Sequence, residues 1–124
     1  MALVTGGDSG IGRAVCYFFA LEGATVAFTY VKGQEDKDAA DALALIKEAK
    51  LSDAKGPVAI ATDLRYEKNC KHVVDEVVNQ FGQIDVLVNN AAVQFYAESI
   101  EEITGDLLRQ TFETNFFAYF FMAR

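Results

Sequence analysis

A glycine-rich segment near the start of the chain has the residue types and spacing of a phosphate-binding turn. It reads Thr5-Gly6-Gly7-Asp8-Ser9-Gly10-Ile11-Gly12, with an apolar run before it and a helix-like stretch after it. Glycines let the backbone turn sharply and approach a phosphate without a Cβ in the way. The free N–H groups and the positive end of a following helix then attract the anion. The segment predicts a dinucleotide pyrophosphate site, and the alternative is a turn that binds nothing. The residues expected to contact the cofactor are Gly6, Asp8, Ser9, Gly10, Ile11 and Gly12.

Polar residues also follow two later apolar runs. Asn89-Asn90-Ala91-Ala92 comes directly after Val86–Val88, and Asp63-Leu64 comes after Val58–Thr62. Asparagines after a strand often only satisfy backbone groups of a turn. A carboxylate such as Asp63 is a favoured helix N-cap, and it can also accept a hydrogen bond from an adenine amino group. Both interpretations of Asp63 stay open.

The end of the second apolar run bears on which dinucleotide would bind. Sites specific for NAD place Asp or Glu there, hydrogen-bonded to the ribose 2′-hydroxyl. This chain has Tyr30 at that place and Lys32 two residues on. A cation favours the 2′-phosphate of NADP, but Glu35 and Asp36 lie nearby, and Lys32 also fits a solvated loop. The sequence therefore predicts NADP or NAD as the cofactor and weakly favours NADP.

Short apolar runs alternate with stretches of helical periodicity along the chain, which is typical of βαβ units. The pattern predicts strands at Ala2–Thr5, Thr25–Tyr30, Val58–Thr62 and Val86–Val88. It predicts helices at Ile11–Leu21, Asp36–Lys50, Glu67–Phe81 and from Asp106 to the end, the last after a turn that Ser99 and Glu102 start as a capping box. The predicted fold class is α/β, a Rossmann-type doubly wound parallel sheet in the order β-α-β-α-β-α-β-α. Residues 1–124 would form part of one dinucleotide-binding domain.

Composition excludes several other classes of protein. The 124 residues are 52% hydrophobic and 23% charged, with a net charge of −7, which describes a globular chain. The acidic balance argues against nucleic acid and anionic membranes as partners. Cys16 and Cys70 fit small buried apolar side chains, and no residues have metal-ligand spacing. A cytoplasmic location is expected.

Three elements together resemble the short-chain dehydrogenase/reductase family. They are Thr5-Gly6-x-x-x-Gly10-Ile11-Gly12, Asn89-Asn90-Ala91-Ala92, in which Ala92 replaces the usual glycine, and Asn115. The segments Gly7–Ala14 and Asn90–Gln94 are most similar to glucose/ribitol dehydrogenase-like members of plants and bacteria.

The resemblance implies hydride transfer between a nicotinamide cofactor and a secondary alcohol, polyol or sugar. It implies that Asp63 and Leu64 lie at the adenine and that Asn89 and Ala91 lie on the ribose side. It also implies that Asn115 is a catalytic residue, which opens its helix and holds a water in the proton relay. Otherwise Asn115 is a surface asparagine.

One part of the family pattern is missing from these residues. Family members hold the reacting carbon with Ser and Tyr, and a Lys in Tyr-x-x-x-Lys lowers the tyrosine pKa toward neutrality. None of the five tyrosines is followed by Lys at that spacing. We therefore expect an N-terminal part of an enzyme, truncated before Tyr-x-x-x-Lys and inactive alone. The alternative is a truncated, non-catalytic dinucleotide-binding or interaction module, and a flavin- or methyl-donor-binding domain fits less well.

The last predicted helix is rich in phenylalanine on more than one face, with Phe112, Phe116, Phe117, Phe120 and Phe121. The resemblance implies that this helix packs against its copy in a second subunit. We expect the full-length protein to be a homo-oligomer, either a dimer or a tetramer.

Overall fold

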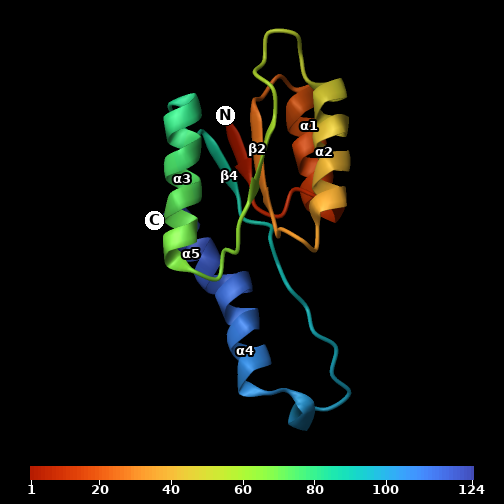
Figure 1. Cartoon of the computed structure of the whole chain (residues 1–124), viewed down its shortest axis with the longest axis vertical. Helices are drawn as coiled ribbons and strands as arrows, with labels where there is room; N and C mark the ends of the chain where they lie inside the picture. Colours follow the sequence, from red (N-terminus) through yellow and green to blue (C-terminus); the bar gives the residue numbers. More distant parts are fainter.

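A computed structural model describes residues 1–124 and shows one parallel sheet between two layers of helices (Figure 1). The strands are β1 (Ala2–Val4), β2 (Val26–Tyr30), β3 (Val58–Ala61) and β4 (Val86–Val88). Their order in the sheet is β3-β2-β1-β4, and Leu3 pairs with both Ala27 and Leu87. The predicted α/β, Rossmann-type fold is confirmed.

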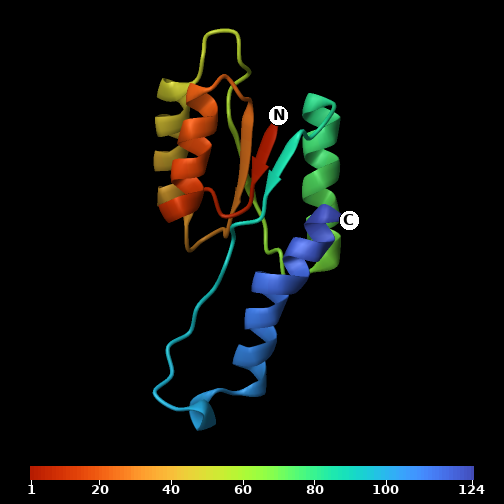
Figure 2. The same ribbon diagram turned by 180° about the vertical axis from the view of Figure 1, so that it is seen from behind.

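Each face of the sheet has its own apolar core, because successive strand residues point to opposite sides. Val4, Val26 and Phe28 pack against α1 (Gly10–Leu21) and α2 (Asp36–Ala49). Leu3 and Ala27 pack on the other face against α3 (Glu67–Phe81) and α5 (Ala118–Ala123), as Figure 2 shows from behind. Both faces are covered, which explains why the strands read as continuous apolar runs.

The boundaries of the first three helices follow the predicted pattern closely. The apolar stripe of α3 buries Val73 and Val77. The helix ends at Gly82, whose φ of 89° lies in the left-handed region that favours glycine. The predicted glycine stop is therefore present.

The last helix, predicted from Asp106 to the end, begins at Gly105, and the local opening expected at Asn115 divides it into two α-helical parts. A 3₁₀ turn, η1 (Ile100–Glu102), precedes α4 (Gly105–Phe112). A wide π turn, η2 (Glu113–Phe117), then separates α4 from α5. The side chain of Asn115, within η2, bonds to the backbone of Val93. A contact between residues so far apart in the chain leaves no sign in the helical periodicity.

The prediction of a capping box at Ser99 and Glu102 is wrong. The Ser99 side chain caps no N–H group, and the Glu102 carboxylate accepts from Glu98 N at 2.9 Å instead. The true cap of α4 is Thr104, whose hydroxyl accepts from Leu107 N at 3.2 Å.

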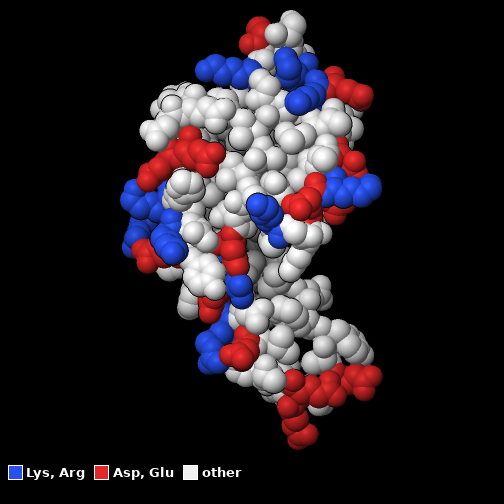
Figure 3. Space-filling view, viewed as in Figure 1, with Lys and Arg blue, Asp and Glu red and all other residues white.

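The segment after β4 and helix α4 extend beyond the sheet, and α4 buries none of its residues (Figures 1 and 2). Acidic side chains gather around η1 at the lower end of the molecule in Figure 3, among them the exposed Glu98, Glu101 and Glu102. None of the helices combines the length and apolar character required to cross a membrane.

Candidate functional site

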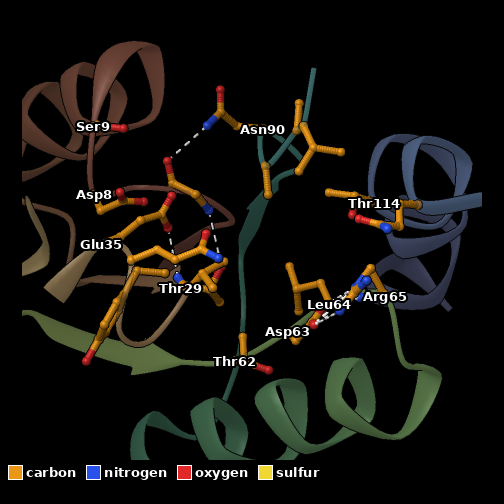
Figure 4. Close-up of a pocket in the computed structure, with 18 of the residues that line it drawn as sticks. Asp8, Ser9, Thr29, Glu35, Thr62, Asp63, Leu64, Arg65, Asn90 and Thr114 are labelled. Atoms are coloured by element: carbon orange, nitrogen blue, oxygen red, sulfur yellow. Dashed lines mark hydrogen bonds and ion pairs between the residues drawn. The ribbon is translucent and has the colours of Figure 1, made fainter. Parts of the chain in front are cut away.

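A cavity of about 420 Å³ lies where the carboxyl ends of the four strands meet. Its wall comes from the turn after β1, the loop after β2, the end of β3 and the segment after β4 (Figure 4). In doubly wound sheets, ligands bind at this edge, at the point where the strand order reverses. The lining includes seven predicted cofactor contacts: Gly6, Asp8, Ser9, Tyr30, Asp63, Leu64 and Ala91.

The glycine turn is packed so closely that three of its positions, Gly6, Gly7 and Gly12, admit no side chain. A Cβ on Gly12 would lie 2.1 Å from the Gly6 carbonyl oxygen. Gly6 has a φ of 68°, and a Cβ there would lie 2.9 Å from the Ala91 Cα. Gly10 also has a positive φ, 55°, but faces open space. Glycine at position 6 is therefore required by both its conformation and its neighbours.

The first turn of α1 begins beside the cavity with its N–H groups uncapped. Ser9 is the N-cap residue, yet its side chain accepts no hydrogen bond from the helix, and the first turn holds no acidic residue. Helix N-termini of this kind favour anions. Gly10, Ile11 and Gly12 form this turn but do not line the cavity, and Ile11 is largely exposed.

Asn90 fastens the glycine turn to the end of β4. Its side-chain nitrogen donates to the carbonyl oxygens of Thr5 and Gly6, both at 3.1 Å. The Thr5 hydroxyl in turn accepts from the backbone N–H groups of Asn90 and Ala91, at 2.9 and 3.0 Å. The sequence alone does not distinguish Asn90 from Asn89 for this role.

Asn89 points elsewhere and lines no part of the cavity. Its side-chain nitrogen donates to Tyr119 O at 3.2 Å, while its Oδ1 is buried without a partner. The Tyr119 hydroxyl donates to Ala91 O at 2.8 Å. Adjacent residues of an extended chain face opposite sides, so Asn89 ties the sheet to α5 while Asn90 faces the cavity. Ala91, further along the segment after β4, lines the cavity as well.

Asp63 lies at the cavity edge, already paired with Arg65. Asp63 Oδ2 accepts from Arg65 Nη2 at 2.7 Å, and Oδ1 accepts from Arg65 N at 3.1 Å. These bonds to Arg65 hold the pKa of Asp63 below its usual value. The N-cap of α3 is Tyr66, so Asp63 closes a turn ahead of the helix and is not its cap. Leu64 is buried in the core at 7% exposure.

The loop after β2 brings an acidic side chain to the cavity and leaves Lys32 outside it. Lys32 is exposed and is not part of the lining, whereas Tyr30 and Glu35 are. Glu35 Oε1 accepts from Val31 N at 2.8 Å, which turns the carboxyl inward. Burial is the main cause that raises the pKa of Glu35 and of Asp8. In the sequence, Glu35 stands out only as a negative charge close to Lys32.

Asn115 lies in the π turn and is bonded to the segment after β4. Its Oδ1 accepts from Val93 N at 2.8 Å, and its Nδ2 donates to Val93 O at 2.9 Å. The expected local opening of the helix is therefore present. Thr114 and Gln110 line the cavity beside it. A role for Asn115 in a proton relay stays a prediction.

Known proteins are similar to this chain in both sequence and fold. The family model described as short chain dehydrogenase matches residues 1–124. A glucose and ribitol dehydrogenase of Daucus carota is 68% identical over 124 residues, which is all of this chain and 43% of that protein. The NADPH-dependent aldehyde reductase 1, chloroplastic, of Arabidopsis thaliana is 64% identical with the same coverage.

A solved structure of a short chain dehydrogenase has the same fold as this chain. A short chain dehydrogenase from Burkholderia cenocepacia J2315 in complex with NADP superposes with a TM-score of 0.87 at 35% identity. The match covers 98% of this chain and 47% of that one. The chain thus spans less than half the length of the proteins it matches, and along its whole length it belongs to the short-chain dehydrogenase family of oxidoreductases.

Proposed function

We propose that the protein containing these residues is an NAD(P)-dependent dehydrogenase or reductase, which transfers hydride between nicotinamide and a secondary alcohol, polyol or sugar. The observation that carries the proposal is the cavity at the four strand ends, with the uncapped start of α1 beside it. The bound dinucleotide would supply the hydride donor or acceptor. The names of the relatives, a glucose and ribitol dehydrogenase and an aldehyde reductase, support this substrate class.

Each part of the cavity has a place in this proposal. The backbone N–H groups of Gly10, Ile11 and Gly12 would bind the pyrophosphate, with Gly6 allowing close approach. Asp63 would accept from the adenine amino group with an oxygen lone pair that Arg65 leaves free. Asn90 would keep the turn in its binding shape, and Ala91 would lie on the ribose side.

We further propose that the cofactor is NADP in preference to NAD. The NADPH-dependent relative and the NADP complex support this preference. Because Lys32 is exposed outside the cavity lining, it gives this preference less support than its sequence position suggested.

A second candidate function is a dinucleotide-binding module without catalysis. Such a module would need only the cavity and the uncapped start of α1, which residues 1–124 contain. Residues 1–124 alone would then bind a cofactor but reduce nothing. Turnover of a polyol or aldehyde by this chain would contradict its proposed inactivity.

The deciding experiment titrates the protein with NADPH and with NADH and follows nicotinamide fluorescence. We expect saturable binding of NADPH and weaker binding of NADH. Gly56→Ala is a matched control, because Gly56 faces open space away from the cavity. Absence of binding to both cofactors would overturn the proposal, and tighter NADH binding would overturn the NADP preference.

A further inference from the structure

Two carboxyl groups from different loops meet in the wall of the cavity, and the cofactor proposal does not use them. Asp8 belongs to the turn after β1, and Glu35 to the loop after β2. Figure 4 shows their carboxyl groups directed toward each other, and a side-chain hydrogen bond with Asp8 is among the causes that raise the pKa of Glu35. Two ionised carboxylates cannot make that bond, because both are acceptors only.

Asp8 is the more deeply buried of the two. It is 2% exposed, and its Oδ2 has no hydrogen-bond partner. Glu35 cannot turn away easily, because its Oε1 accepts from Val31 N at 2.8 Å. A single proton between the two groups would satisfy the orphaned Asp8 oxygen and remove one of two facing negative charges.

No cation beside the pair takes the place of that proton. Arg13 of α1 donates to the backbone oxygens of Asp8 and Asp38, at 2.8 and 3.2 Å. Its one salt bridge is with the Asp38 carboxylate, at 3.8 Å. From α2, Asp38 adds negative charge, and from β2 the pair faces only uncharged side chains such as Thr29. Burial and these acidic neighbours raise the pKa of both Asp8 and Glu35.

We propose that Asp8 and Glu35 share one proton and that this pair sets how strongly the site prefers a 2′-phosphorylated dinucleotide. The inference rests on the proposed function. In Rossmann-type sites the ribose 2′ position lies near the end of β2, where Glu35 enters the cavity. A pair that holds the shared proton carries one negative charge instead of two, so it repels a 2′-phosphate less. A deprotonated pair accepts from a 2′-hydroxyl and repels the phosphate.

The pair therefore links the choice of cofactor to pH. Binding of NADPH takes up or retains the shared proton, and binding of NADH does not need it. The ratio of the NADH to the NADPH dissociation constant rises as pH falls, by at most about tenfold per pH unit, the limit for one linked proton. No other group in the cavity wall combines such burial with an unpartnered oxygen.

The test measures both dissociation constants on the intact protein between pH 6 and 8.5, by nicotinamide fluorescence. Glu35→Gln keeps an acceptor for Val31 N but cannot titrate, so its ratio loses most of its pH slope. Asp8→Asn gives the same result through the other partner, should the first variant not fold. Asp41→Asn is the matched control, because Asp41 lies on α2 in an exposed pair with Lys37, and it keeps the wild-type slope.

The 2′-phosphate of NADPH itself titrates near neutrality, but it does so equally with every variant. The informative quantity is therefore the difference in slope between wild type and each variant. Equal slopes in wild type, Glu35→Gln and Asp8→Asn would overturn the shared proton and leave the proposed function standing. Absence of binding to either cofactor at every pH would overturn both.

Discussion

Gly12→Ala tests the geometry of the glycine turn. The new Cβ would lie 2.1 Å from the Gly6 oxygen and 2.5 Å from Asn90 Nδ2. An ordinary contact begins at 3.4 Å, so the turn and α1 must separate by about 1.3 Å. Overpacking of this kind costs about 1–3 kcal/mol, and the strained hydrogen bond from Asn90 adds about 1 kcal/mol.

The helix itself returns part of this cost. Alanine is favoured over glycine within a helix by about 1 kcal/mol. The net expectation is a loss of about 2 kcal/mol of unfolding free energy. Displacement of the N–H groups of α1 also weakens NADPH binding more than tenfold, because charge-assisted bonds to the phosphates lose their geometry.

Two measurements check this expectation. Urea unfolding is followed by circular dichroism, since the chain contains no tryptophan. NADPH binding is followed by nicotinamide fluorescence. Gly56→Ala, with no neighbour within 4 Å, stays within about 0.5 kcal/mol of wild type. The reasoning is refuted if Gly12→Ala matches this control in both assays.

Asn115→Ala removes both bonds to Val93 and lowers the unfolding free energy by about 1–3 kcal/mol, measured by urea titration; an unchanged midpoint would contradict the brace between helix and loop. Burial raises the pKa of the Cys16 thiol to about 12, so a thiol reagent at pH 8 leaves it unmodified until denaturant is added. Fast modification of the native protein would count against this. The pKa of Asp8 is raised in the folded state. The contribution of Asp8 to the free energy of unfolding therefore falls as the pH rises from its pKa in the unfolded chain through its pKa in the folded protein. Asp8→Asn therefore flattens the decline in stability above pH 4, and a profile parallel to wild type would speak against it. Phe120→Lys replaces a phenylalanine that is 58% exposed with a charged residue, and we expect it to reduce self-association measured by analytical ultracentrifugation. Unchanged self-association would contradict a subunit contact at that face.

The sequence predicted most of the fold because the relevant signals are local. The apolar runs and the stop at Gly82 are set by periodicity and by the conformational freedom of glycine. The break between α4 and α5 was not predictable in this way. It accompanies two hydrogen bonds between Asn115 and Val93, which are 22 residues apart.

The candidate site also has a part that local sequence signals predict and a part that depends on contacts between distant residues. The glycine turn is recognisable from spacing alone, since its constraint is backbone geometry. Which asparagine of the pair faces the cavity depends on how β4 is turned in the sheet, so Asn89 and Asn90 were not separable beforehand. The meeting of Asp8 with Glu35 depends on two loops packed together, although the Asp63–Arg65 pair lies close enough in sequence to be found by inspection.

The bond from Asn90 N to the Thr5 hydroxyl has a consequence for how the protein is assembled. It joins residues 85 positions apart, between the first strand and the last. The glycine turn therefore cannot take its final shape until β4 has docked beside β1, and this step is slow because closing a long loop costs conformational entropy. Partly folded molecules lack the finished turn, so a dinucleotide bound at the proposed site would stabilise only the complete sheet. The cofactor should then slow turnover of the polypeptide by proteases as well as serve its chemistry.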